Sequence, residues 1–118
     1  MSAEDPLIEL RDRLRHFAAE RDWDQFHSPK NLAMALSVEV AELVEHFQWL
    51  SEDASLSLPA DKLLEVGEEA ADVLVYLIRL ADKLGIDLAA AARAKIAVNA
   101  LKYPVEKSRG SIRKYTEL

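Results

Sequence analysis

Two pairs of acidic residues interrupt stretches of this sequence that are otherwise almost entirely apolar. Glu39 and Glu42 are the only charged residues in the range 31–44, and Glu69 precedes the run AADVLVYLI, in which Asp72 is the only charge. Each pair has i,i+3 spacing, which places its two carboxylates on one face of an α-helix. Such acids must be paired or must bind a cation, because burying an isolated carboxylate is costly.

The first pair has no basic residue nearby to neutralise it. No Lys or Arg lies between Lys30 and Lys62, and the range 39–72 contains ten acids and one base. Carboxylate oxygens are the ligands that Mg²⁺ and Mn²⁺ prefer in proteins. The sequence therefore predicts a divalent metal, Mg²⁺ or alternatively Mn²⁺, held between two facing helices.

The spacing of the apolar residues predicts an all-α fold. Proline at a first helical position starts two of the helices, at Pro6 and Pro29, while Gly85 and Pro104 mark two ends. Four helices are expected, over about residues 6–20, 29–50, 59 or 61 to 84, and 88–103, with a linker at 51–59. Four helices of these lengths favour a four-helix bundle.

The chain is expected to divide into a helical domain, residues 1–104, and a basic C-terminal tail, residues 105–118. Residues 102–118 carry five basic and two acidic side chains, whereas the whole chain has a net charge of −6. The second and third helices are apolar nearly all round, so one protomer cannot cover them completely. We therefore expect a homodimer or a homotetramer.

Composition excludes several classes of function. There is no cysteine, which rules out disulfides and thiol chemistry, and no apolar run reaches the ~20 residues that span a bilayer. The acidic centre would repel a nucleic-acid backbone. The N-terminal decapeptide is acidic and does not resemble a secretory signal, so the expected location is the cytoplasm, with neither nucleic acid nor membrane as a partner.

Three stripes of polar and aromatic residues have helical spacing. They comprise Glu39, Glu42, His46 and Trp49 on the second helix, Glu65, Glu69, Asp72 and Tyr76 on the third, and Lys95, Asn99 and Lys102 on the fourth. The first two combine oxygen ligands with an aromatic ring, and the third offers cations and an amide suited to phosphate oxygens. Together they indicate a site for a nucleotide.

These residues also carry a resemblance to a known family. The segments FAAERDWDQFHSPKNLAMALSVEVAELVEHFQW, EEAADVLVYLIRLA and VNALKYP, within residues 6–104, resemble the MazG-like all-α nucleoside triphosphate pyrophosphohydrolases, and among them the dCTP pyrophosphatase subgroup. The resemblance implies Mg²⁺-dependent hydrolysis between the α and β phosphates, which yields a monophosphate and pyrophosphate. The expected role is removal of dCTP or modified dCTP from the nucleotide pool.

The resemblance also implies roles for individual residues. The metal ligands would be Glu39, Glu42, Glu69 and Asp72, and the substrate would contact Trp23, His27, Trp49, Tyr76, Asn99, Lys102 and Tyr103. Glu39 and Glu42 are the expected catalytic residues, with Glu42 orienting or deprotonating the attacking water and Glu68 as a second candidate. Leu14 departs from the vertebrate enzymes, which carry His there.

Other functions compete with this interpretation. The same scaffold suits dUTP hydrolysis or broad nucleotide hydrolysis. A non-catalytic helical interaction module with a structural metal site belongs to a different class. A di-iron carboxylate bundle is excluded because it needs Glu-x-x-His pairs, and no Glu stands three residues before any His in this chain.

Overall fold

In the computed structural model, which describes residues 5–118, every element of regular structure is a helix. The predicted all-α class is confirmed. The long helices are α1 (Pro6–Glu20), α2 (Pro29–Glu45), α4 (Ala60–Lys83) and α5 (Leu88–Lys102). The short ones are η2 (Asp24–Phe26), α3 (Glu52–Ser55), α6 (Val105–Ser108) and η3 (Tyr115–Glu117). Among residues 5–118 no helix combines the length and the apolar character that crossing a membrane requires.

The chain divides into two compact units, residues 1–86 and residues 87–118. The first unit contains α1 to α4, and the second contains α5, α6 and η3. The sequence instead predicts a helical functional domain up to residue 104 and a basic tail after it. That functional division stays a prediction.

Side-chain caps fix the starts of three long helices. Asp5, Ser28 and Asp87 each accept a hydrogen bond from a backbone N–H two or three residues further on, at 2.9–3.1 Å. Such caps satisfy donors that have no partner inside the helix. Gly85 follows α4 with a φ of +67°, a left-handed conformation that glycine adopts at little cost. These boundaries agree with the sequence prediction.

The predicted end of α2 near Leu50 is wrong, because the helix ends at Glu45. Beyond it, the N–H groups of His46 and Phe47 bond to carbonyls three residues back, so the chain tightens into turns. Ser51 is then extended, with a ψ of 163°, and caps α3 inside the segment that was expected to be a linker. A local cap therefore overrides the continuous apolar pattern.

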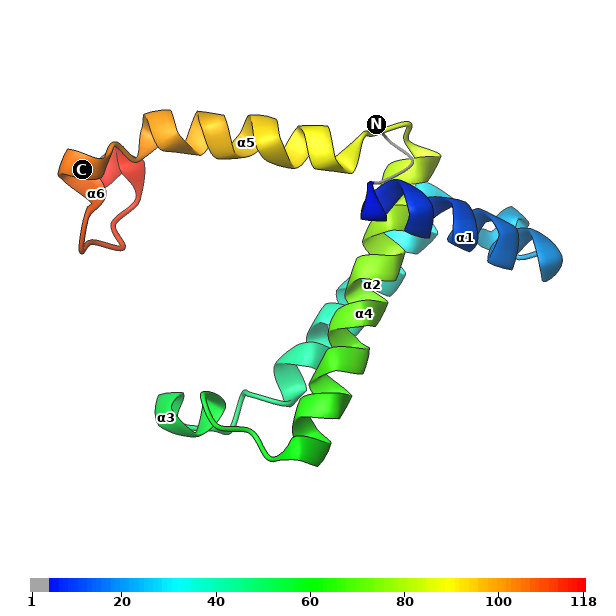
Figure 1. Cartoon of the computed structure of the whole chain (residues 1–118), viewed down its shortest axis with the longest axis horizontal. Coiled ribbons are helices and arrows are strands. Elements are labelled where there is room, and N and C mark those ends of the chain that lie inside the picture. Colours follow the sequence, from blue (N-terminus) through cyan, green and yellow to red (C-terminus); the bar gives the residue numbers. More distant parts are fainter. Residues whose placement is uncertain (1–4) are drawn as a thin grey trace. The chain divides into compact units, whose positions relative to one another are not determined.

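In the first unit α2 and α4 lie side by side, and α1 packs against α4 (Figure 1). The buried apolar residues are Ala18 of α1, Leu32 of α2, and Ile78 and Ala81 of α4. They come from the C-terminal end of α1, the first turn of α2 and the C-terminal half of α4. The packed core therefore lies where these three segments meet.

Large apolar side chains elsewhere on α2 and α4 remain exposed in the single chain. Val38 of α2 is 55% exposed, and Leu63 and Leu64 of α4 are 60% and 67% exposed. Exposed large apolar side chains that gather on a surface are a common mark of contact with another protein molecule. The exposed faces bear on the oligomer proposed below.

Candidate metal centre

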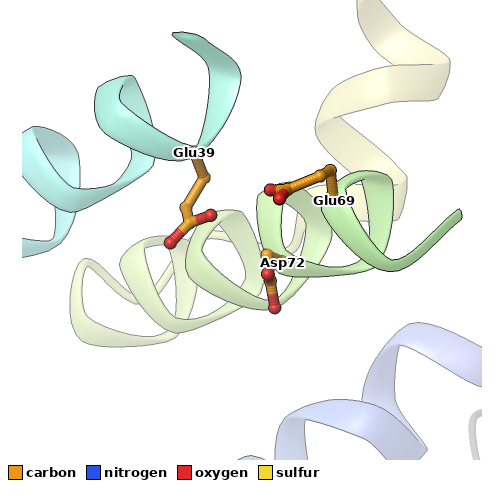
Figure 2. A group of neighbouring side chains, drawn as sticks. All are labelled: Glu39, Glu69 and Asp72. Carbon is orange, nitrogen blue, oxygen red and sulfur yellow. The ribbon is translucent and has the colours of Figure 1, made fainter. Parts of the chain in front are cut away.

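Three of the four predicted ligands come together between α2 and α4. Figure 2 shows Glu39 reaching from α2 toward α4, on which Glu69 and Asp72 lie one turn apart. One oxygen atom from each of the three lies within 4.8 Å of the others. The i,i+3 spacing on α4 thus brings two carboxylates to the helix face that meets α2.

The surroundings of this cluster disfavour its negative charge. The pKa of Glu39 is raised to about 7, first by burial, next by the contact with Glu42 and its charge, and then by the charges of Asp72 and Glu69. Burial likewise raises the pKa of Glu69, followed by the charge of Glu42 and the contact with it. Like charges that share a partly desolvated site have this effect on carboxyl groups.

The cluster also has hydrogen-bonding capacity that no other group among residues 5–118 uses. The Oε2 atoms of Glu39 and Glu69 are buried without a hydrogen-bond partner. The salt bridges of residues 5–118 involve other acids and none of the predicted ligands. Free acceptor oxygens and repelling carboxylates, without a salt bridge to any Lys or Arg among residues 5–118, are the properties that a divalent cation would satisfy. The chain therefore contains an acidic group that fits a divalent metal.

Glu42 has a different place from the other three predicted ligands. It lies outside the group whose oxygens gather within 4.8 Å, but it is near enough to raise the pKa of both Glu39 and Glu69. It stands one turn after Glu39 on α2. Glu42 is therefore at the edge of the cluster, where a carboxylate can face a water molecule or complete the ligand set.

A second group of charged residues lies in the same unit and was not predicted. Arg79 of α4 is 4% exposed and donates to Oδ1 of Asp24 at 2.9 Å, and Lys83 lies 2.6 Å from the same oxygen. Asp82 lies 3.6 Å from Arg79 and accepts from Nε of Arg15 on α1 at 2.8 Å. Cations and acids alternate here, so each charge has an opposite neighbour.

The sequence contained a signal for this ion-pair network. In the run VLVYLIRLA, residues 73–81, Arg79 is the only charged residue. A single Arg in an apolar helix seldom stays buried without acidic partners. Those partners could not be identified from the sequence, because Asp24 lies 55 residues away and Arg15 bonds across 67 residues to Asp82.

Comparisons with known proteins identify the family. A model of the MazG-like family matches residues 34–118. The chain belongs to this family. The dCTP pyrophosphatase 1 of Mus musculus is 46% identical over 119 residues, covering 99% of this chain and 70% of that protein, and that of Homo sapiens is 44% identical with the same coverage. The crystal structure of a pyrophosphatase from Archaeoglobus fulgidus has a TM-score of 0.77 and 46% identity, covering 81% of this chain and 90% of that one.

Two predicted substrate residues of this MazG-like chain lie in the connection between α1 and α2. Trp23 is 45% exposed and packs edge-on against Phe17 of α1, with ring centroids 5.8 Å apart. The imidazole Nδ1 of His27 lies 3.2 Å from Nη2 of Arg79. Burial, and next the charge of Arg79, lower the pKa of His27. His27 is therefore expected to be neutral at pH 7.

Trp49 and Tyr76 follow the two acid pairs along the chain. Trp49 stands in the turn after α2 and is 87% exposed, so it is not a core residue of the single chain. Tyr76 is half-buried on α4, one turn after Asp72. An indole with nearly its whole surface exposed is available for stacking on a ligand or for contact with another protomer.

The remaining predicted contacts belong to the second unit of the MazG-like chain. Asn99 and Lys102 stand in the last turn of α5, and Tyr103 follows as its C-cap. The tail returns to this helix end, where the ring of Tyr115 lies 4.8 Å from Nζ of Lys102 and 6.0 Å from the ring of Tyr103. Amide, amino and hydroxyl groups therefore gather at one end of α5.

Proposed function

We propose that this chain hydrolyses dCTP, or a modified dCTP, to dCMP and pyrophosphate with Mg²⁺ as cofactor. The chain is a nucleotide pyrophosphohydrolase, as its similarity to the dCTP pyrophosphatases over nearly its whole length shows. The observation that supports the metal requirement is the cluster of Glu39, Glu69 and Asp72, in which the buried Oε2 atoms of Glu39 and Glu69 have no hydrogen-bond partner among the described residues. A triphosphate is itself an anion, and it can approach this cluster only with metal ions between them.

The acids of the cluster have separate tasks in this reaction. Glu39, Glu69 and Asp72 would hold the ion, with Glu42 as the fourth ligand of the expected set. Bound Mg²⁺ supplies charge neutralisation for the phosphates and a water molecule of lowered pKa. The carboxylate of Glu42 orients the attacking water in line with the α phosphorus and accepts its proton. Glu68, one residue before Glu69 and exposed on α4, is the alternative base.

The base and the phosphates would be held by residues outside the cluster. Trp23 and Trp49 offer indole faces for stacking on the base, which is worth about 1–3 kcal/mol per base and discriminates little among bases. His27 and Tyr76 offer the polar groups that can discriminate. The groups at the end of α5, namely Asn99, Lys102 and Tyr103, would bind phosphate oxygens.

We further propose that the enzyme is a homodimer or homotetramer in which the long helices form four-helix bundles. The support is the exposure of Val38, Leu63 and Leu64 on helices that are apolar nearly all round. Light scattering on the active enzyme tests the proposal, and a stable, active monomer would contradict it. Nucleic acid and membrane are not proposed as partners, given the net charge of −6, and the proposed location is the cytoplasm.

Pyrophosphate release from a panel of nucleoside triphosphates, with Mg²⁺ and with EDTA, tests the function. We expect dCTP or a modified dCTP to give the highest kcat/KM, and EDTA to abolish turnover. Mn²⁺ should restore activity, since it accepts the same oxygen ligands. The highest kcat/KM with dUTP, or similar rates with all nucleotides, would favour the alternative hydrolases. No pyrophosphate from any nucleotide would favour the non-catalytic module.

A further inference from the structure

Arg79 has an arrangement that the proposed reaction does not explain. Its side chain is buried on α4 beside Ile78, which is 4% exposed. Its guanidinium donates to Asp24 and contacts His27, and both residues belong to the connection between α1 and α2 that also carries Trp23. One buried cation on α4 therefore binds a segment with two expected base-contacting residues.

Stability alone is a weak reason for a buried Arg. Its Nε is buried without a hydrogen-bond partner, which is an unfavourable arrangement for a charged donor. Replacing a buried ion pair with apolar side chains often leaves stability unchanged or improves it. Here the acids would keep other partners, because Asp24 also pairs with Lys83 and Asp82 also pairs with Arg15. The use of Arg at this position calls for a different explanation.

The connection has a defined shape of its own. Asp22 has a φ of +54°, and its side chain and carbonyl both accept from the amide of Gln25, at 2.9 and 3.1 Å. The N–H of Trp23 donates to the carbonyl of Ala18 at 2.9 Å, at the end of α1. Arg79 is thus not needed to form the turn. It fixes the turn to α4 at two points, Asp24 beside Trp23 and the ring of His27.

The contact with His27 also determines which ring nitrogen carries the proton. A guanidinium has donors and no acceptor, so Nη2 of Arg79 can only donate to Nδ1 of His27, which lies 3.2 Å away. Neutral His27 must then carry its hydrogen on Nε2. The other edge of the ring becomes a hydrogen-bond donor.

We propose that Arg79 is a positioning residue for base selection, which fixes His27 as an Nε2–H donor and anchors Trp23, given the proposed function in which both contact the base. A ring donor matches N3 of cytosine, which is an acceptor. N3 of uracil or thymine carries a hydrogen and would oppose the same donor. Arg79 thus favours dCTP over dUTP by setting the tautomer of a neighbouring residue, without touching the nucleotide itself.

The kinetic test compares dCTP with dUTP in Arg79→Met, Arg79→Lys and the matched control Arg93→Met, whose Arg is exposed on α5. Arg79→Met should raise KM for dCTP roughly 10-fold, with a smaller change in kcat. The preference for dCTP, measured as kcat/KM for dCTP divided by kcat/KM for dUTP, should also fall roughly 10-fold. Arg79→Lys keeps the positive charge on a single donor nitrogen and should restore part of the preference for dCTP over dUTP. Arg93→Met should match the wild type. A lower melting temperature for Arg79→Met with unchanged KM and ratio, measured well below that temperature, would overturn the proposal.

Imidazole ¹⁵N NMR tests the tautomer without any turnover. The wild-type enzyme should show His27 protonated on Nε2, with His27→Gln used to assign its signals among the three histidines. Arg79→Met should shift this resonance pair toward a mixture of tautomers. An Nδ1–H tautomer in the wild type would overturn the proposal. This measurement is independent of the proposed function. If the chain hydrolysed no nucleotide, the proposed base contact would fail, but the tautomer of His27 could still be measured.

A milder variant separates the two parts of the proposal. Asp24 is exposed, so Asp24→Asn should leave the packing of Arg79 intact while weakening the hold on Trp23. We expect a KM for dCTP raised a few-fold, with the His27 tautomer and the dCTP to dUTP ratio retained. If Asp24→Asn changed the His27 tautomer but left KM unchanged, Asp24 would act on His27 and not on Trp23. That result would contradict the proposed anchoring of Trp23.

Discussion

Two groups of acidic side chains in the first unit have opposite electrostatic surroundings. In the metal cluster, burial and neighbouring acids raise the pKa of Glu39 and Glu69. In the ion-pair network, the hydrogen bond from Lys83 is the largest cause of a lowered pKa at Asp24, and the one from Arg15 has that effect at Asp82. Each acid of the network has a Lys or Arg partner, whereas the acids of the cluster have none among residues 5–118 and fit a cation from outside.

The opposite pKa shifts distinguish acids that stabilise the fold from acids that are proposed to bind a ligand. Where Arg and Lys supply the opposite charge, the carboxylates join α1, α4 and the connection that carries Trp23. Where neither Lys nor Arg forms a salt bridge with the acids, the carboxylates repel one another, and we expect this repulsion to destabilise the metal-free protein. Perturbed pKa values of this second kind are typical of functional sites.

The largest expected effect is loss of activity when a cluster acid is neutralised. Asp72→Asn should lower kcat/KM for dCTP at least about 100-fold, because even outer partners of metal ligands cost 10–100-fold when they are removed. The same variant should melt no lower than the wild type in EDTA, since one repelling charge is gone. Pyrophosphate release and thermal melting check both effects, with Asp53→Asn on α3 as the control. Near-normal turnover would remove Asp72 from the ligand set.

Mg²⁺ should stabilise the protein through the cluster. A ligand of the native state at 100 times its Kd adds about 2.7 kcal/mol to the free energy of unfolding. The melting temperature should therefore rise by several degrees in Mg²⁺ relative to EDTA. Glu69→Gln should reduce this rise, and Glu9→Gln on the outer surface of α1 should not. A rise of equal size in Glu69→Gln would place the stabilising ion elsewhere.

In the ion-pair network, neutralising an acid should instead destabilise the fold. Asp82 is 11% exposed and faces Arg15 and Arg79, so Asp82→Asn would remove the close acidic partner of Arg15 and the second acidic partner of the buried Arg79. We expect the free energy of unfolding to fall by on the order of 2 kcal/mol, less than for a fully buried pair because Arg15 is half exposed. Asp12→Asn, at an exposed pair, should cost under about 1 kcal/mol. Urea denaturation measures the loss of unfolding free energy in both variants. Equal losses would contradict the structural role that is assigned to Asp82.

The smallest effect concerns the pH dependence of stability without metal. Glu39 has a pKa of about 7 against an ordinary value of 4.5, so the native state binds more protons between these values and stability rises as pH falls through that window. Asp24 and Asp82 have lowered pKa values, so their contribution is present above about pH 4 and is lost as pH falls further. In EDTA the melting temperature should peak near about pH 5. A melting temperature that rises from pH 5 to pH 8 in EDTA would contradict the repulsion between carboxylates that is inferred for the cluster.

Much of the fold could be predicted because the relevant signals are local. Asp5, Ser28 and Asp87 precede their helices, and each caps the helix it precedes. The end of α2 could not be predicted because apolar residues continue after Glu45, while Ser51 begins a new helical turn that the periodicity does not reveal. Apolar periodicity indicates the face of a helix better than its end.

The sequence by itself determined that this is an all-α MazG-like chain and that four acids stand on two helix faces. Spacing of three and four residues suffices for that, because the helix repeat fixes which side chains share a face. Only the tertiary structure decided that Glu39, Glu69 and Asp72 meet while Glu42 stands at their edge, and that Arg79 joins Asp24 and His27. These contacts link segments far apart in the chain. They depend on how α2, α4 and the preceding connection pack, which no local pattern specifies.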